Sequence, residues 1–399
     1  MVSKETISDS SDPCPSENQS EFQTGRVLTL SVSHFVNDTY SSFLAPLLPL
    51  IIDKLSLSLT QAGFLTTVMQ IPSLANPYIG ILADRISVRY FIILAPSLTA
   101  VPMSLVGLAP SYGVLLLLML GTGISVSMFH VPAPVMIYRL SGIKAGRGMS
   151  FFMTGGELAR TVGPLAAVGT VSLLGLEGFY PIMIFGLLTS LWLYLGFRDV
   201  PLKTVGKTPS SVRKTWKEIR HILLPLSIIL FARGFMHACL TAFLPTFIRT
   251  ETGNLWLGGI ALTLFESMGV AGIMAAGTLS DRLGRGRILL FSLLGAPIFL
   301  LLFVSFGGWF RFLSLAFTGF SLLSTTPVML ALVQDHAKSS PSTANGLFMM
   351  MSFMGRSATV VLVGLVSDHL GLRTAYLVSA VAGLAAIPFV LRLTDRHPQ

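Results

Sequence analysis

The residues with the most distinctive chemistry are ionisable side chains that lie inside long apolar runs. Three of them are acidic and three are basic, so their formal charges balance. Three histidines lie at similar depth in runs of the same kind. An ionised side chain in the interior of a lipid bilayer costs at least ~2.5 kcal/mol, so each of these residues is a candidate functional group. The nine residues are Asp38, Glu157, Glu266, Arg160, Arg233, Arg356, His34, His130 and His237.

Two of the acidic residues have a basic neighbour at helical spacing. His34 and Asp38 are four residues apart and Glu157 and Arg160 three, which places each pair on one face of a helix. Burial favours the protonated form of a carboxyl group, and a nearby guanidinium favours the ionised form. Asp38 could therefore take up and release a proton if its contact with a basic group changes. The alternative is that such pairs are structural locks between helices.

The basic residues have the chemistry of an anion site. A guanidinium carries a planar fork of N–H donors that matches the oxygens of a carboxylate or a phosphate. Arg233 and His237 share a helix face at a spacing of four, and Arg160 and Arg356 lie in two further apolar runs. Together they could bind an anionic group. His130 precedes two prolines, so its imidazole could instead satisfy backbone groups that those prolines free.

The composition indicates an integral membrane protein. Hydrophobic residues make up 52% of the 399 positions and charged residues 11%, whereas soluble chains average roughly 25% charged residues. Apolar runs of about 20 residues, long enough to cross the hydrocarbon core, recur along the chain. We expect an all-α chain of about twelve transmembrane helices, over residues 27–52, 61–83, 90–109, 112–138, 149–174, 180–197, 223–248, 257–279, 288–306, 309–333, 344–366 and 375–393.

Polar stretches divide the chain into four parts. Residues 1–25 have no apolar core and are predicted to be a disordered tail. Residues 199–221 are polar and basic and are predicted to be a linker, with a short basic helix at the membrane surface near 212–220. They separate a six-helix half at 26–198 from a second half at 222–399.

The loop charges predict the orientation. Most Lys and Arg residues outside the spans lie on the side that holds both chain ends and the linker, and only Lys54, Arg249, Arg311 and Arg373 lie on the other side. Both termini are therefore expected to be cytoplasmic. The same distribution argues against nucleic acid as the partner of this chain, although its net charge is +9. The expected surroundings are a lipid bilayer.

The two halves are related in sequence. Residues 31–49 align with 227–245 at an offset of 196, which places Asn37 over Arg233. A glycine-rich charged hairpin occurs near Gly80 and again near Gly277, at an offset of 197. Gly148 and Met153 have counterparts 198 residues later. Two parallel six-span repeats are the architecture of a large class of transporters, whose substrate site lies at the midplane between the repeats.

The hairpins carry a family resemblance. The second copy resembles the G-x-L-x-D-R-x-G-R-[KR] motif of the major facilitator superfamily, and the first copy matches in part, with Ser and Val where the motif has Gly and Arg. The resemblance implies a fold of two pseudo-symmetric six-helix halves and a cytoplasmic gate at these hairpins. The gate residues implied are Gly80, Asp84, Arg85, Gly277, Asp281, Arg282 and Arg285.

A narrower resemblance is to the fosmidomycin resistance branch. It rests on residues 34–38, on Phe-His-Val-Pro-Ala at 129–133, and on the pairs Gly155-Gly156 and Gly163-Pro164. The branch usually has Phe-His-Pro-Glu-Ala in the fourth span, so the acidic residue is absent here. The resemblance implies export of drug-like compounds in exchange for protons. The resemblance to the superfamily also implies that the first and seventh spans face each other across a central cavity, which Asp38 and Arg233 could both line.

These observations predict a proton-coupled exporter of a small amphipathic or anionic compound, monomeric and located in the plasma membrane. The alternatives are an importer of a small organic anion, and a membrane sensor or assembly partner that transports nothing. The sequence has no phosphate-binding G-x-x-x-x-G-K-[ST] loop, no hydrolase context and no metal-ligand spacing, so no enzymatic activity, cofactor or metal is expected. The predicted proton-coupling residues are Asp38, His34, Glu157 and Glu266. The predicted substrate-binding residues are Asn37, His130, Arg160, Arg233, His237 and Arg356.

Overall fold

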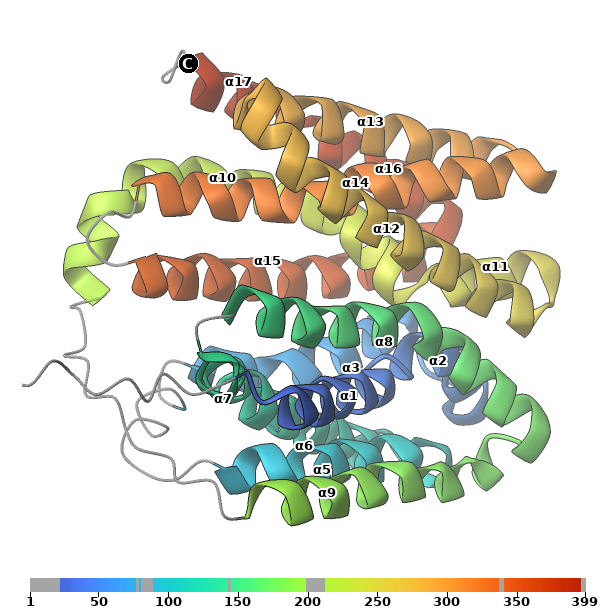
Figure 1. Ribbon diagram of the computed structural model, residues 1–399. Coiled ribbons are helices and arrows are strands. Elements are labelled where there is room, and N and C mark those ends of the chain that lie inside the picture. Colours follow the sequence, from blue (N-terminus) through green and yellow to red (C-terminus); the bar gives the residue numbers. More distant parts are fainter. Residues whose placement is uncertain are drawn as a thin grey trace, which may run out of the picture.

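The computed structural model describes residues 22–76, 79, 89–142, 145–198, 212–336 and 341–395, and these residues form helices without strands (Figure 1). The first half contains α1 (Thr24–Ser41), α2 (Leu44–Leu55), α3 (Leu59–Gln70), η1 (Ile71–Ala75), α5 (Arg89–Ser104), η2 (Val106–Leu108), α6 (Tyr112–His130), α7 (Ala133–Ser141), α8 (Ala145–Leu174), η4 (Glu177–Ile182) and α9 (Met183–Phe197). The second half contains α10 (Val212–Ala242), α11 (Leu244–Thr252), α12 (Leu255–Leu283), α13 (Arg285–Ser305), α14 (Gly308–His336), α15 (Pro341–Leu370), α16 (Leu372–Leu384) and α17 (Ile387–Asp395).

The expected pattern of membrane spans is confirmed. Ten segments of the described chain are long and apolar enough to cross a membrane. The other two expected spans correspond to α3 with η1, which runs up to residues outside the described part, and to α8, which has 30 residues but carries Glu157 and Arg160. The predicted tail lies almost wholly outside the described residues. The predicted basic helix is the first part of α10, which Figure 1 shows at an angle to the rest of that helix.

Several of the described spans are broken into two helices near a proline. The break between α6 and α7 falls at Val131 and Pro132, because proline donates no backbone N–H and disfavours a helical residue before it. α1 gives way to α2 at Ser42 and Phe43, and α10 gives way to α11 at Phe243. The first of these breaks places His130 at the C-terminal end of α6.

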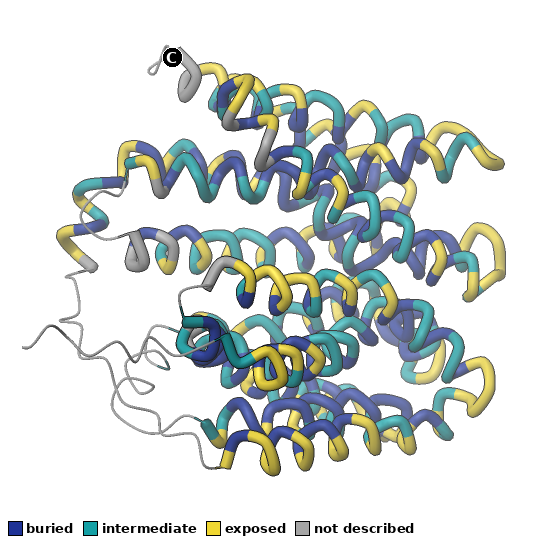
Figure 2. The backbone as a smooth tube through the Cα atoms, in the orientation of Figure 1, coloured by how far each residue is buried: buried dark blue, intermediate teal, exposed yellow. Residues whose placement is uncertain are grey.

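Among the described residues, the helices form two groups that share a hydrophobic core at one end. One cluster of buried residues includes Phe43 and Leu47 of the first half and Phe243 and Val360 of the second. Figure 2 shows buried segments of both groups at the end of the molecule that lies away from the C-terminus. At the other end, each half has a core of its own, which includes Leu30 in the first half and Leu223 and Val333 in the second. The two halves therefore pack tightly on the side where α2 and α11 lie (Figure 1).

The contact between α3 and α15 is a close approach of two backbones. A Cβ atom built on Gly63 would lie 2.7 Å from the carbonyl oxygen of Val360, and one built on Gly364 would lie 2.5 Å from that of Leu59. Toward the middle of the molecule, the hydroxyl of Thr67 donates a hydrogen bond to the Ser357 carbonyl, at 3.0 Å. Glycine is required at positions 63 and 364 because no side chain fits between the two helices there.

Asp368 of α15 completes the N-terminal cap of α3 across the two halves. Within α3, the Ser58 hydroxyl accepts from the Gln61 N–H, which leaves the first two N–H groups without an internal partner. The Asp368 carboxylate accepts both, from Leu59 at 2.6 Å and from Thr60 at 2.9 Å. It also accepts from the Thr60 hydroxyl at 2.5 Å. At the same end, Arg249 of α11 forms an ion pair with Asp53 of α2, with an N–O distance of 2.7 Å.

Candidate functional site

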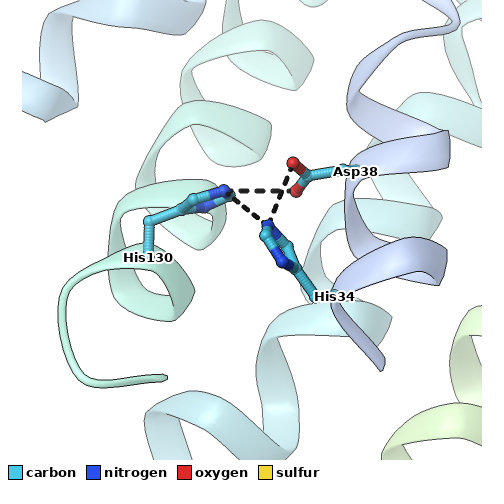
Figure 3. A group of neighbouring side chains, drawn as sticks. All are labelled: His34, Asp38 and His130. Atoms are coloured by element: carbon cyan, nitrogen blue, oxygen red, sulfur yellow. Dashed lines mark hydrogen bonds and ion pairs between the residues drawn. The ribbon is translucent and has the colours of Figure 1, made fainter. Parts of the chain in front are cut away.

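His34, Asp38 and His130 form a compact group in the first half (Figure 3). The Nε2 atom of His34 lies 3.3 Å from Oδ2 of Asp38, and the Nε2 atom of His130 lies 3.3 Å from Oδ1. The two Nε2 atoms are 3.3 Å apart. The predicted shared face of His34 and Asp38 on α1 is confirmed, whereas His130 joins them from α6. The three residues together are called the His–Asp–His cluster below.

Backbone carbonyls fix the orientation of both imidazoles. The Nδ1 atom of His34 lies 2.8 Å from the Phe152 carbonyl oxygen, and that of His130 lies 2.9 Å from the Val126 carbonyl oxygen. A carbonyl oxygen can only accept, so the Nδ1 atom of each ring is the donor. In its neutral form, each ring then presents an Nε2 lone pair to Asp38.

Packing of α8 against α1 holds the His34 ring in place. The ring stacks on Phe152, with ring centroids 4.0 Å apart. A Cβ atom on Gly156 would lie 2.6 Å from Cε1 of His34, so only glycine leaves room for the ring. A Cβ atom on Gly155 would lie 2.4 Å from the Ser31 carbonyl oxygen. The Gly155-Gly156 pair therefore allows α8 to lie directly against the imidazole and the α1 backbone.

Asn37 orients Asp38 from the buried side of α1. Its Nδ2 atom donates to Oδ1 of Asp38 at 3.1 Å, and its Oδ1 atom accepts from the Thr99 hydroxyl at 2.8 Å. The Thr99 hydroxyl also lies 2.8 Å from that of Ser125. Asn37 is fully buried. These contacts favour a positioning role for Asn37 over the predicted contact with a substrate.

A second group of charges is carried by α8, α12 and α15, of which α8 packs against α12. Arg160 forms an ion pair with Glu157 on α8, as the spacing predicted. Arg160 also interacts electrostatically with Glu266 of α12, and Arg356 of α15 interacts with both Arg160 and Glu266. Glu266 is buried, whereas the Arg160 side chain is 45% exposed. Charges from the two halves of the chain therefore meet at one place.

Arg233 and His237 of α10 border this second group. Arg233 is buried, and its Nη1 atom donates to the Thr326 hydroxyl of α14 at 3.1 Å, while its Nε atom has no hydrogen-bond partner among the described residues. Its guanidinium lies near enough to that of Arg356 for repulsion between them. His237 lies within electrostatic range of all three arginines. We call the six residues Glu157, Arg160, Arg233, His237, Glu266 and Arg356 the arginine-rich cluster.

Arg160 connects the two clusters, because it also interacts electrostatically with Asp38 and His130. Asp38 and Arg233 were expected to line one cavity, but their direct partners in the described residues differ. Asp38 contacts the two histidines and Asn37, whereas Arg233 contacts Thr326. Threonine is too common in apolar helices for its hydrogen bond to Arg233 to be predicted from the sequence.

The second hairpin motif forms a cross-link at the surface. Gly284, between α12 and α13, has a φ of 96°, a conformation that glycine adopts without strain. Arg285 then pairs with Asp335 of α14 through two contacts, at 2.7 and 3.1 Å. The Arg282 side chain is exposed. The first copy, with Gly80, Asp84 and Arg85, lies outside the described residues. In the second copy, Gly277 and Asp281 lie within α12, and the Asp281 side chain is outside the described part.

Comparison with known proteins agrees with this architecture. The sequence model of the family described as Major Facilitator Superfamily matches residues 30–358 and 226–399. The fosmidomycin resistance protein of Escherichia coli (strain K12) is 26% identical over 382 residues, which cover 92% of each chain. An uncharacterized MFS-type transporter of Bacillus subtilis (strain 168), YfnC, is 24% identical over 390 residues, which cover 93% of this chain and 94% of YfnC.

Solved structures show the same fold at low sequence identity. A bacterial homolog of the human lysosomal transporter Spinster, in an inward-facing and unoccupied conformation, superposes with a TM-score of 0.80 at 16% identity and covers 95% of this chain and 98% of the homolog. The nucleoside transporter NupG gives a TM-score of 0.75 at 14% identity, with 93% of this chain and 99% of NupG covered. The resemblance therefore extends over both halves.

Proposed function

The chain belongs to the major facilitator superfamily, and on that premise we propose that it is a proton-coupled secondary transporter of a small anionic or amphipathic compound. The observation that carries the proposal is the arginine-rich cluster, to which both halves contribute charged side chains within the apolar helices. A charge inside a membrane is costly, and a purely structural bundle gains little from six such residues. A substrate bound there contacts both halves, as alternating access requires.

The charge balance of the arginine-rich cluster supports an anionic substrate. Three guanidinium groups face two carboxylates, those of Glu157 and Glu266. Arg160 already has Glu157 as its partner, whereas Arg233 has only a hydroxyl among its described hydrogen-bond partners. Arg233 and Arg356 can therefore bind a carboxylate or a phosphate-like group without first breaking an ion pair of their own.

The same cluster supports coupling to protons. An anion that binds beside Glu157 and Glu266 repels their negative charges, and a proton on either carboxyl group removes that repulsion. Because such linkage is reciprocal, protonation also strengthens binding of the anion. Asp38 and His34 remain predicted coupling residues. Asp38 is connected to this cluster through Arg160, and His34 contacts Asp38.

One observation supports export of the compound, and another supports import. The relative from Escherichia coli is a resistance protein, which supports export in exchange for protons. The electrostatics favour a second candidate, because an anion and a proton that strengthen each other's binding tend to move together. With an inward proton gradient, joint movement gives import. We propose export as the main function and import as the alternative.

The packing of the two halves supports an alternating-access cycle. If the termini are cytoplasmic, as the loop charges predict, then the shared core and the Asp368 cap lie at the extracellular end. The structure then corresponds to a state closed to the outside. Opening of that end and closure at the hairpin end would give the opposite state, in which the Arg285–Asp335 cross-link lies beside the closed gate.

Transport in vesicles tests the proposal. The purified protein is reconstituted with an internal pH dye, a pH gradient is imposed, and organic anions and amphipathic compounds are added in turn. We expect proton flux that depends on the added compound. If the protein is an exporter, protons should move in the direction opposite to the compound. If it is an importer, protons and compound should move in the same direction. Glu266→Gln should uncouple the two fluxes, and Arg233→Gln should raise the concentration of compound needed for half-maximal flux.

A matched control and the opposite outcome complete this test. Glu177→Gln removes a carboxylate that pairs with Lys54 at the surface and should leave the flux unchanged. Proton flux that persists in Glu266→Gln would remove Glu266 from the coupling role, and Asp38→Asn tests the other cluster in the same way. If no compound of either class moves or drives proton flux, the chain is better described as a sensor or an assembly partner.

A further inference from the structure

The His–Asp–His cluster presents several acceptor atoms to one point. Because each Nδ1 atom donates to a backbone carbonyl, the neutral imidazoles of His34 and His130 both present Nε2 lone pairs. The Asp38 carboxylate turns one oxygen toward each of them. Acceptors that face one another in this way need a cation between them. A single proton bridges one such contact, whereas a metal ion at the centre is bound by all three side chains.

The separations match those of ligands around one metal ion. Zn²⁺ binds imidazole nitrogen and carboxylate oxygen at about 2.0–2.1 Å, and tetrahedral ligands at that radius lie about 3.3 Å apart. The Nε2–Nε2 contact of the cluster measures 3.3 Å, and each Nε2 atom lies 3.3 Å from a different oxygen of the Asp38 carboxylate. Two imidazoles and one carboxylate are also a ligand set that suits divalent ions of the first transition series.

Each ligand of the cluster has a second partner that holds it in place. The two imidazoles donate to the carbonyls of Phe152 and Val126, which is the usual arrangement for metal-binding histidines. The Asp38 carboxylate accepts a hydrogen bond from Asn37, at 3.1 Å. The site therefore needs little reorganisation to receive an ion.

The surroundings permit an ion to enter and to stay. The His130 side chain is 36% exposed and the Asp38 side chain 14%, so an ion reaches the cluster from the His130 side. The His34 side chain is only 5% exposed and closes the opposite side. Arg160 is the nearby cation, and its charge is offset by its ion pair with Glu157. With neutral imidazoles, Asp38 leaves the site with one net negative charge.

We propose that His34, Asp38 and His130 form a binding site for one divalent transition-metal ion of the Zn²⁺ class. Three protein ligands leave a fourth position for water or for an oxygen of a bound compound. The ion joins α1 to α6 directly beside the break at Val131. A proton and the metal ion compete for the same acceptors, so metal affinity should fall as the pH is lowered. Binding of the ion does not depend on the proposed transport activity.

Cobalt binding to the purified full-length protein tests the proposal. The affinity tag is removed, the protein is treated with a chelator in detergent, and Co²⁺ is titrated in. We expect one equivalent of Co²⁺ to give the intense visible absorption of a four-coordinate site, and Zn²⁺ to abolish that absorption by displacement. His130→Gln and Asp38→Asn should each weaken binding more than about 100-fold, and Asn37→Ala about 10–100-fold.

A second histidine pair provides the matched control. The rings of His221 and His336 lie 5.7 Å apart. The double variant His221→Gln/His336→Gln should keep the wild-type cobalt spectrum and stoichiometry. Thermal unfolding without metal identifies a variant that is misfolded, and the wild-type titration stands independently of every variant. The proposal is overturned if wild-type protein binds no stoichiometric Co²⁺ or Zn²⁺, or if binding is lost in the double variant and retained in His130→Gln.

The metal titration and the transport assay fail in different ways. Cobalt binding is measured without a pH gradient or a transported compound, so an inactive transporter with an intact cobalt spectrum refutes only the proposed function. A chain that transports in the presence of a chelator and binds no metal refutes only the metal site. Added Zn²⁺ should reduce proton flux in wild-type vesicles if both proposals hold.

Discussion

Replacement of Asp368 should shift the equilibrium between the two transport states. Its carboxylate accepts two backbone N–H groups and one hydroxyl of α3 across the interface between the halves. A side chain that caps a helix N-terminus contributes about 0.5–2 kcal/mol. When the halves separate at this end, water replaces the carboxylate, so the full capping contribution favours the closed state. Taking about 1.4 kcal/mol, Asp368→Ala should increase the open-to-closed ratio about tenfold.

Distances between spin labels measure this ratio. Leu173 in the first half and Trp309 in the second are highly exposed near the packed end and can be replaced by cysteine for labelling. Cys14 is replaced by serine beforehand, and Cys239 is buried away from the reagent. Double electron–electron resonance should show a longer-distance population that grows in Asp368→Ala. Asp368→Asn, which keeps one acceptor oxygen, should give an intermediate increase.

A variant at the same end supplies the control. Glu177 pairs with Lys54 at 2.8 Å, and both residues belong to the first half. Glu177→Gln removes a surface charge without touching the interface, so its distance distribution should match the wild type. An Asp368→Ala distribution that also matches the wild type would refute the idea that this cap favours the closed state.

Two further predictions concern packing and the hairpin. Gly156→Ala places a methyl group 2.6 Å from the His34 ring and should destabilise the protein by about 1–3 kcal/mol, seen as a lower melting temperature in detergent. Gly196→Ala, with nothing within 4 Å, is the control and should be neutral or slightly stabilising. Arg285→Gln breaks the pair with Asp335 and should slow transport while leaving compound selectivity unchanged. Altered selectivity would place Arg285 in substrate binding instead.

The spans and the short-range pairs were predictable from the sequence because they depend on local properties. Hydropathy determines which segments cross a membrane, and the spacing of Glu157 and Arg160 is enough to bring them together in a helix. The same reasoning placed His34 beside Asp38. The family was also recognisable, since its hairpin motif lies between spans at matching positions in both halves.

The long-range partners were not predictable because they depend on how helices are placed. His130 lies 92 residues after Asp38, and only the packing of α6 against α1 brings them together. The histidines therefore looked like separate candidates and no metal-ligand spacing was visible. Asp368 was missed for another reason. Its main partners are backbone N–H groups, which have no sequence signature.

The glycine contact between α3 and α15 has a consequence for controlling this protein. Gly63 and Gly364 each face a carbonyl of the opposite helix, so the two halves meet there over bare backbone. A single added methyl group at either position acts as a wedge at this end of the molecule and does not touch either cluster of ionisable residues. Alanine at Gly63 or Gly364 thus offers a minimal way to trap the state that is open at this end, for structural work or for selecting conformation-specific binders.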